Sequence, residues 1–111
     1  MKILAIRGKN LASLAGEFVL DFQSEPLASA GLYAITGATG SGKSTLLDAL
    51  CLALYEQTPR LSGVTGSATI TDVANNAITP GDVRSILRRG CSDGYAEVDF
   101  VGSTGISYRA R

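Results

Sequence analysis

The sequence predicts an α/β domain in which a short buried strand leads through a phosphate-binding loop into a buried helix. Three observations predict this class. Residues 37–44 read Gly-Ala-Thr-Gly-Ser-Gly-Lys-Ser and match the pattern G-x-x-x-x-G-K-[ST]. An apolar run precedes this motif and an apolar helical pattern follows it, which is the order that a phosphate-binding loop requires. Alternating segments on either side of this unit predict an antiparallel hairpin before it and a further hairpin after it.

The first expected element is a strand over residues 2–9, and a second strand follows over residues 17–22. In the second strand Phe18, Leu20 and Phe22 alternate with polar or outward-facing residues, so one face is expected to be buried. We place the turn between the two strands at Gly16. An antiparallel hairpin therefore precedes the phosphate-binding loop.

Residues 32–36 form the short apolar run that is expected to be the buried strand. Residues 43–55 are expected to form a helix that is apolar nearly all round, which favours burial between two layers. We expect this helix to end near Glu56, because Pro59 disfavours helical geometry at Thr58.

The phosphate-binding loop carries specific chemical roles. The backbone amides of residues 39–44 are expected to cradle phosphates, and the Lys43 ammonium to neutralise their charge. The Ser44 hydroxyl is expected to ligate Mg²⁺, and Thr45 to touch the α phosphate. The predicted cofactors are ATP and Mg²⁺, and the predicted binding residues are Gly37, Thr39, Gly40, Ser41, Gly42, Lys43, Ser44 and Thr45.

Residues 57–80 are small, polar and β-branched, and a connection of this length is either functional or mobile. Asp82 or Thr79 is expected to cap a short helix that ends at Gly90, with Arg88 and Arg89 in its last turn.

Two strands, 95–101 and 106–111, complete the expected fold. A left-handed Gly105 in the turn between them would place Asp99 opposite Arg109 and Glu97 opposite Arg111.

Composition narrows the function classes. Ten basic and ten acidic residues balance, so bulk charge gives no indication of nonspecific nucleic-acid binding. There is no histidine, and Cys51 and Cys91 lack metal-ligand spacing, which argues against a zinc site. The apolar start of the chain soon meets Arg7 and Lys9 and is too short for a signal peptide or a membrane span, so we expect a cytoplasmic protein.

Several segments before and after the phosphate-binding loop, one of them reaching its first glycine, share a further likeness: residues 1–4, Lys9-Asn10-Leu11 with Ser13-Leu14, residues 32–37, and residues 46–55. Together they resemble the N-terminus of the bacterial SbcC family, the large ATPase subunits of a nuclease complex that is related to the SMC proteins. The resemblance is strong over residues 1–61 and weaker afterwards.

The resemblance implies a P-loop NTPase fold of the ABC-ATPase type, of which residues 1–111 form the N-terminal part of one head domain. It implies that the rest of the head and a long coiled coil lie outside this chain. It further implies four partners: the C-terminal lobe of the same protein, a second head in an ATP-dependent homodimer, an SbcD-like metallo-nuclease, and DNA. No membrane partner is expected.

Further residue roles come with the resemblance. Asn10 and Ser13 become candidate nucleotide contacts, the alternative being a turn that caps its own backbone. Basic side chains that could pair with DNA phosphates are Arg60, Arg84, Arg88 and Arg89. The alternative for the arginines at the helix end is a favourable interaction with the helix dipole.

We expect no catalytic residue within the chain, because a phosphate-binding loop supplies only one side of the environment that phosphoryl transfer needs. The preferred interpretation is the ATP-binding part of an ATPase that drives DNA end processing in double-strand break repair with a nuclease. Two alternatives stay open: a recombination or repair protein of the SMC superfamily without a nuclease partner, and a P-loop kinase.

Overall fold

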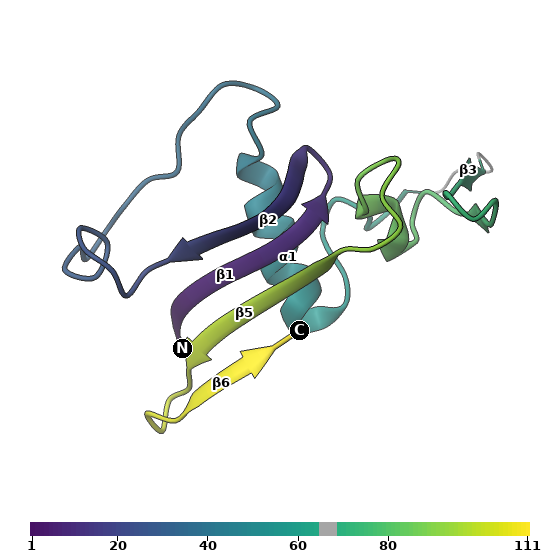
Figure 1. The fold of residues 1–111 in the computed structure, drawn as a ribbon. Coiled ribbons are helices and arrows are strands. Elements are labelled where there is room, and N and C mark those ends of the chain that lie inside the picture. Colours follow the sequence, from purple (N-terminus) through teal and green to yellow (C-terminus); the bar gives the residue numbers. More distant parts are fainter. Residues whose placement is uncertain (65–68) are drawn as a thin grey trace.

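The computed structural model describes residues 1–64 and 69–111, and it has an α/β architecture (Figure 1). Four strands form an antiparallel sheet in the order β2-β1-β5-β6. Their bounds are Lys2–Leu11 for β1, Leu14–Asp21 for β2, Tyr95–Val101 for β5 and Ser107–Ala110 for β6. The helix α1, Lys43–Tyr55, packs across β1 and β5 on one face of this sheet.

The hairpin of β1 and β2 confirms the expected alternation. Phe18 pairs with Gly8 and Leu20 with Ile6, and both side chains are partly buried against the core. The turn, however, lies at Ala12 and not at Gly16, which is inside β2. Asn10 and Ala12 adopt positive φ angles of 52° and 45°, and this sharp reversal makes a later turn unnecessary.

The hairpin of β5 and β6 has the predicted register. Gly105 has a φ of 80°, and Asp99 pairs with Arg109. The Nε atom of Arg109 lies 2.6 Å from Oδ1 of Asp99, and Nη1 of Arg111 lies 3.9 Å from Oε2 of Glu97. Nη1 of Arg7 in β1 donates to both acidic residues, at 3.2 Å to Glu97 and 2.6 Å to Asp99, so the ion pairs run across three strands.

The core lies between the sheet and α1. Its buried members include Ile6 of β1, Val98 of β5 and Ala49 of α1. The expectation that α1 is sandwiched is wrong for the described residues, because Leu47 and Tyr55 on its far side are 59% and 70% exposed. The sheet covers one face of the helix, and Thr58 and Arg60 contact it at Asp48, but Leu47 and Tyr55 stay exposed. The helix ends as predicted, with Glu56 as its C-cap.

The expectation of a buried strand at residues 32–36 is also wrong. This segment has no strand structure, and Leu32 is 92% exposed. Figure 1 shows the connection between β2 and α1 as a long excursion away from the sheet. A strand needs a neighbouring strand for its backbone hydrogen bonds, and no described strand pairs with this segment. Its anchor is instead Tyr33, which stacks on the buried Phe22 at 5.1 Å between ring centroids.

In the described parts of residues 57–91, which are 57–64 and 69–91, the secondary-structure elements are short. Two-residue strands, β3 at Ile70–Thr71 and β4 at Ala77–Ile78, pair with each other. The expectation for residues 57–80 includes positions 65–68, which lie outside the described residues.

The predicted capped helix is the 3₁₀ helix η1, Val83–Ile86, whose N-cap Asp82 accepts a hydrogen bond from the Arg84 amide. Gly90 does not end it, because the helix stops at Ile86, and Arg88 and Arg89 therefore follow the helix and are not in its last turn. After η1 the backbone turns to bond with β1, where the Arg88 amide donates to the Asn10 carbonyl at 2.8 Å.

Candidate nucleotide-binding site

The helix α1 begins at the end of the phosphate-binding loop, residues 37–44. Gly42, the N-cap, has a φ of 97°, which favours glycine, and no described side chain caps the first amides of the helix. An uncapped helix N-terminus presents N–H groups and a positive dipole end to an anion. The local backbone is therefore suited to a phosphate.

Gly42 is also held by its surroundings. A side chain at this position would collide with Leu14 at the start of β2 and would reach within 3.4 Å of the Ser13 hydroxyl. The turn of the first hairpin thus packs directly against the end of the phosphate-binding loop. Both the conformation and the space at this position require glycine.

Lys43 folds back into the loop. Its Nζ donates to the carbonyls of Gly37 and Ala38 at 2.6 and 2.7 Å, and to Ser41 Oγ at 3.4 Å. The Ser41 amide closes the loop by donating to the Ala38 carbonyl at 3.1 Å. The ammonium is therefore at the centre of the bend, where a bound anion would meet it.

A cavity of about 520 Å³ opens beside the helix N-terminus. It brings together Ser13, Thr39, Gly40, Gly42, Lys43, Ser44 and Thr45, all of which the sequence predicted. Ser44 is exposed to this space, whereas the Thr45 residue is 3% exposed. Gly37 and Ser41 do not line the cavity but hold Lys43.

Asn10 is not among the residues that line this cavity. Its Oδ1 accepts from the Gly16 amide at 2.9 Å, and its Nδ2 donates to the Asp93 carbonyl at 3.0 Å. The side chain thus satisfies backbone groups, as the alternative expects, but they belong to β2 and to the segment before β5 and not to its own turn.

Two residues that the sequence did not assign to this site also line the cavity, Ala12 and Arg60, and of these Arg60 is charged. Arg60, in the connection after α1, lies beside the loop and the start of the helix. Its Nη2 is 2.5 Å from Oδ2 of Asp48. The spacing of Ser44 and Asp48, one helical turn apart, places Asp48 near the site, but no sequence signal identifies Arg60 as its partner, because that contact depends on the turn at Thr58.

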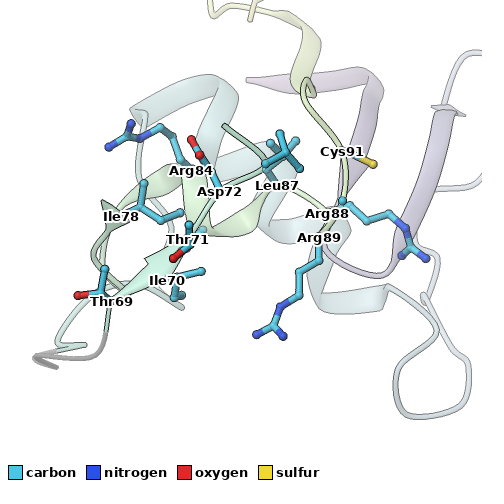
Figure 2. A pocket seen from close by; sticks show the side chains of 13 residues that line it. Thr69, Ile70, Thr71, Asp72, Ile78, Arg84, Leu87, Arg88, Arg89 and Cys91 are labelled. Atoms are coloured by element: carbon cyan, nitrogen blue, oxygen red, sulfur yellow. The ribbon is translucent and has the colours of Figure 1, made fainter. Parts of the chain in front are cut away.

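The other three arginines do not converge on one point. Figure 2 shows the guanidinium groups of Arg84, Arg88 and Arg89 pointing in different directions around a second cavity. Arg84 pairs with Asp82 at 2.6 Å. Nη1 of Arg88 donates to the carbonyls of Ala12 and Ser13, at 3.1 Å each, and so braces the turn next to the nucleotide cavity.

Two further features of the described residues, 1–64 and 69–111, are the grouping of their metal-ligating side chains and the length and apolar character of their helices. These ranges contain no group of three or more histidine, cysteine, aspartate or glutamate residues that could hold a metal ion. Both cysteines, Cys51 and Cys91, are half-buried free thiols. Within the same described part of the chain, no helix has the length and apolar character needed to cross a membrane.

Comparison with known proteins supports a nucleotide-binding assignment. A family model described as an AAA domain matches residues 5–111. Relatives named as the C subunit of the nuclease SbcCD are 64% identical in Pseudomonas aeruginosa and 55% identical in Rhodobacter capsulatus, each over all 111 residues. A protein of the same name in Bacillus subtilis is 46% identical over 65 residues, or 59% of this chain and 6% of that protein. The chain spans 9% of the length of the first two relatives.

Proposed function

Because this chain belongs to the AAA domain family, we propose that it is the ATP-binding N-terminal lobe of an SbcC-like ATPase head. The intact protein then drives DNA end processing in double-strand break repair with a nuclease partner. The observation that carries the proposal is the cavity at the N-terminus of α1, where Lys43, Ser44 and uncapped amides meet. The name of the relatives favours a nuclease complex over a kinase or over a repair protein that acts without a nuclease.

The donors in the cavity fit a triphosphate. Helix amides and the Lys43 ammonium complement its negative charge, and the loop offers them without a competing acidic side chain in the first turn of α1. The exposed hydroxyl of Ser44 would hold Mg²⁺ together with the phosphate oxygens. Bound there, the ion neutralises charge on the β and γ phosphates.

Hydrolysis requires more than this cavity provides. A group must orient the attacking water, and further charges must stabilise the far side of the γ phosphate. In the proposal these groups come from the C-terminal lobe of the same protein and from a second head that closes over ATP. The nucleotide then controls association of the heads, and the SbcD-like nuclease and DNA are the partners of the assembled complex. Such a complex acts in the cytoplasm, where bacterial DNA lies.

The test of nucleotide binding is Lys43→Ala in the full-length protein. We expect affinity for ATP·Mg²⁺, measured by calorimetry, to fall by about 30-fold, the equivalent of about 2 kcal/mol for a charge-assisted hydrogen bond. Lys9→Ala is the matched control, since Lys9 is a lysine of β1 that pairs with Asp93 at 2.7 Å and does not line the cavity. Equal ATP affinity in wild type and Lys43→Ala would reject the assignment.

The nuclease partner has a separate test. We expect the full-length protein to co-purify with an SbcD-like metallo-nuclease when the two are expressed together. If they elute apart while ATP binding is intact, the alternative of an SMC-superfamily protein without a nuclease gains support.

A further inference from the structure

Asp48 is a charged residue in a buried position. It lies on α1, one turn after Ser44, and is 6% exposed. Its Oδ1 accepts a hydrogen bond of 2.5 Å from the hydroxyl of Thr58. Its Oδ2 has no aligned hydrogen-bond donor within the described ranges but lies 2.5 Å from the Arg60 guanidinium, so the attraction there is electrostatic. A buried carboxylate is costly unless it is paired, which indicates that this contact has a specific role.

Thr58 connects the carboxylate to the backbone that carries Arg60. Thr58 is 2% exposed, and its hydroxyl oxygen also accepts from the Arg60 amide at 3.4 Å. The Leu61 amide donates to the Thr58 carbonyl at 3.0 Å, so the chain turns tightly at this point. The base of the Arg60 side chain and its guanidinium are therefore both held by α1, through Thr58 and Asp48.

The side chain that is held in this way lies at the nucleotide cavity. Arg60 lines it together with Lys43 and Ser44, and the Arg60 side chain is 43% exposed. A guanidinium has five N–H donors in a planar fork. Asp48 approaches the guanidinium at Nη2, and one carboxylate cannot occupy all five N–H donors, which leaves donors for an anion in the cavity.

We propose that Arg60 is a second phosphate-binding cation of the nucleotide site, and that Asp48 is the positioning residue that holds it there. This inference rests on the proposed function of the cavity. It replaces the sequence-based expectation that Arg60 contacts DNA. Arginine suits this role because its fork can bind two phosphate oxygens at once.

The proposal predicts a dependence on ligand charge. Attraction between a guanidinium and a phosphate chain grows with the negative charge of the chain. Arg60→Ala is therefore expected to weaken ATP binding by about 10-fold, to weaken ADP binding less, and to leave the weak binding of adenosine unchanged. Arg60→Lys, which keeps the charge but not the fork, is expected to recover part of the lost ATP affinity.

The positioning role of Asp48 calls for a double-mutant cycle in the full-length protein, with ATP·Mg²⁺ affinity measured by calorimetry. Asp48→Asn alone is expected to weaken ATP binding by about 5-fold, because the amide keeps an acceptor for Thr58 but loses the charge that holds Arg60. Added to Arg60→Ala, it is expected to cause no further loss. If Asp48→Asn does not fold by circular dichroism, Thr58→Ala takes its place in the cycle.

The matched control is Arg84→Ala, which breaks another arginine–aspartate pair. This pair lies at the start of η1, after the connection of residues 57–80. The partner, Asp82, lies 2.6 Å away, and neither residue lines the nucleotide cavity. We expect its ATP affinity to equal that of the wild type.

Three results would overturn the inference, and each can be told apart from failure of the proposed function. If Lys43→Ala loses ATP affinity but Arg60→Ala does not, the site binds nucleotide without Arg60. If Arg60→Ala keeps its ATP affinity and loses affinity for a DNA duplex, the guanidinium serves DNA. If Asp48→Asn weakens ATP binding equally with and without Arg60, Asp48 does not act through Arg60.

Discussion

Asp99 follows the buried Val98 in β5, so its side chain points to the face of the sheet opposite α1. On that face it lies at the centre of the ion pairs. Arg109 donates to its two oxygens at 2.6 and 3.0 Å, and Arg7 donates to Oδ2 at 2.6 Å. The hydrogen bonds from Arg109 are the largest reason why the pKa of Asp99 is lowered from 3.8 to about 2. The substitution Asp99→Asn removes the charge on which these contacts depend.

The size of the effect follows from the shift in pKa. A change from 3.8 to about 2 corresponds to at most about 2.5 kcal/mol of stability. The Arg109 side chain is 59% exposed, and solvent screening reduces the value to about 1 kcal/mol. Since the folded-state pKa lies below the unfolded one, this stability is fully present above about pH 4 and is lost as the pH falls through about 2.

The assay is urea denaturation of the 111-residue chain, followed by circular dichroism at pH 7 and at pH 2.5. Asp99→Asn is expected to lower the free energy of unfolding by about 1 kcal/mol at pH 7 and by clearly less at pH 2.5. Asp93→Asn is the control, because the Asp93 side chain is 66% exposed and pairs with one lysine. The reasoning fails if the difference between wild type and Asp99→Asn is absent at pH 7, or if it is as large at low pH.

Two further predictions concern the scaffold of the site. Val98 is 0% exposed between the sheet and α1, and Val98→Ala is expected to lower the free energy of unfolding by about 2 kcal/mol. The loss is measured as a lower urea midpoint at unchanged slope. An unchanged midpoint would contradict the description of the core. Asn10→Ala loses hydrogen bonds to Gly16 and Asp93 and is expected to cost about 1–2 kcal/mol while ATP affinity in the full-length protein stays the same. A marked fall in that affinity would make Asn10 a nucleotide contact after all.

Elements with local signals could be predicted from the sequence. The bounds of α1 followed from the loop motif at its start and from Pro59 beyond its end, and both are interactions within a few residues. The register of β5 and β6 followed from Gly105 together with the need to pair Asp99 with Arg109. In each case the residues that decide the structure are close in sequence, so a local sequence pattern is enough to predict it.

Features that depend on distant residues could not be predicted in this way. The turn of the first hairpin was misplaced because local rules favour Gly16 as a turn residue, whereas none requires the positive φ angles of Asn10 and Ala12. The contact of Asp48 with Arg60 depends on how the chain turns at Thr58, which no pattern within α1 indicates. The cavity was predicted from the loop, but its wall at Arg60 was not.

The two wrong expectations, that residues 32–36 form a buried strand and that α1 is buried between two layers, have one physical origin. Apolar patterning at residues 32–36 and around α1 indicates that these side chains are selected for contact with other protein, but it does not say which segment provides the contact. Leu32, Leu47 and Tyr55 are exposed in the described structure, and large exposed apolar side chains that cluster on one element mark a surface that is covered in an assembly. A missing strand beside residues 32–36 and a missing layer over α1 are what a C-terminal lobe would supply under the proposed function. The exposed apolar side chains therefore lie where the proposal places the rest of the head. Their exposure favours the ATPase-lobe assignment over a kinase, which would cover them with its own chain.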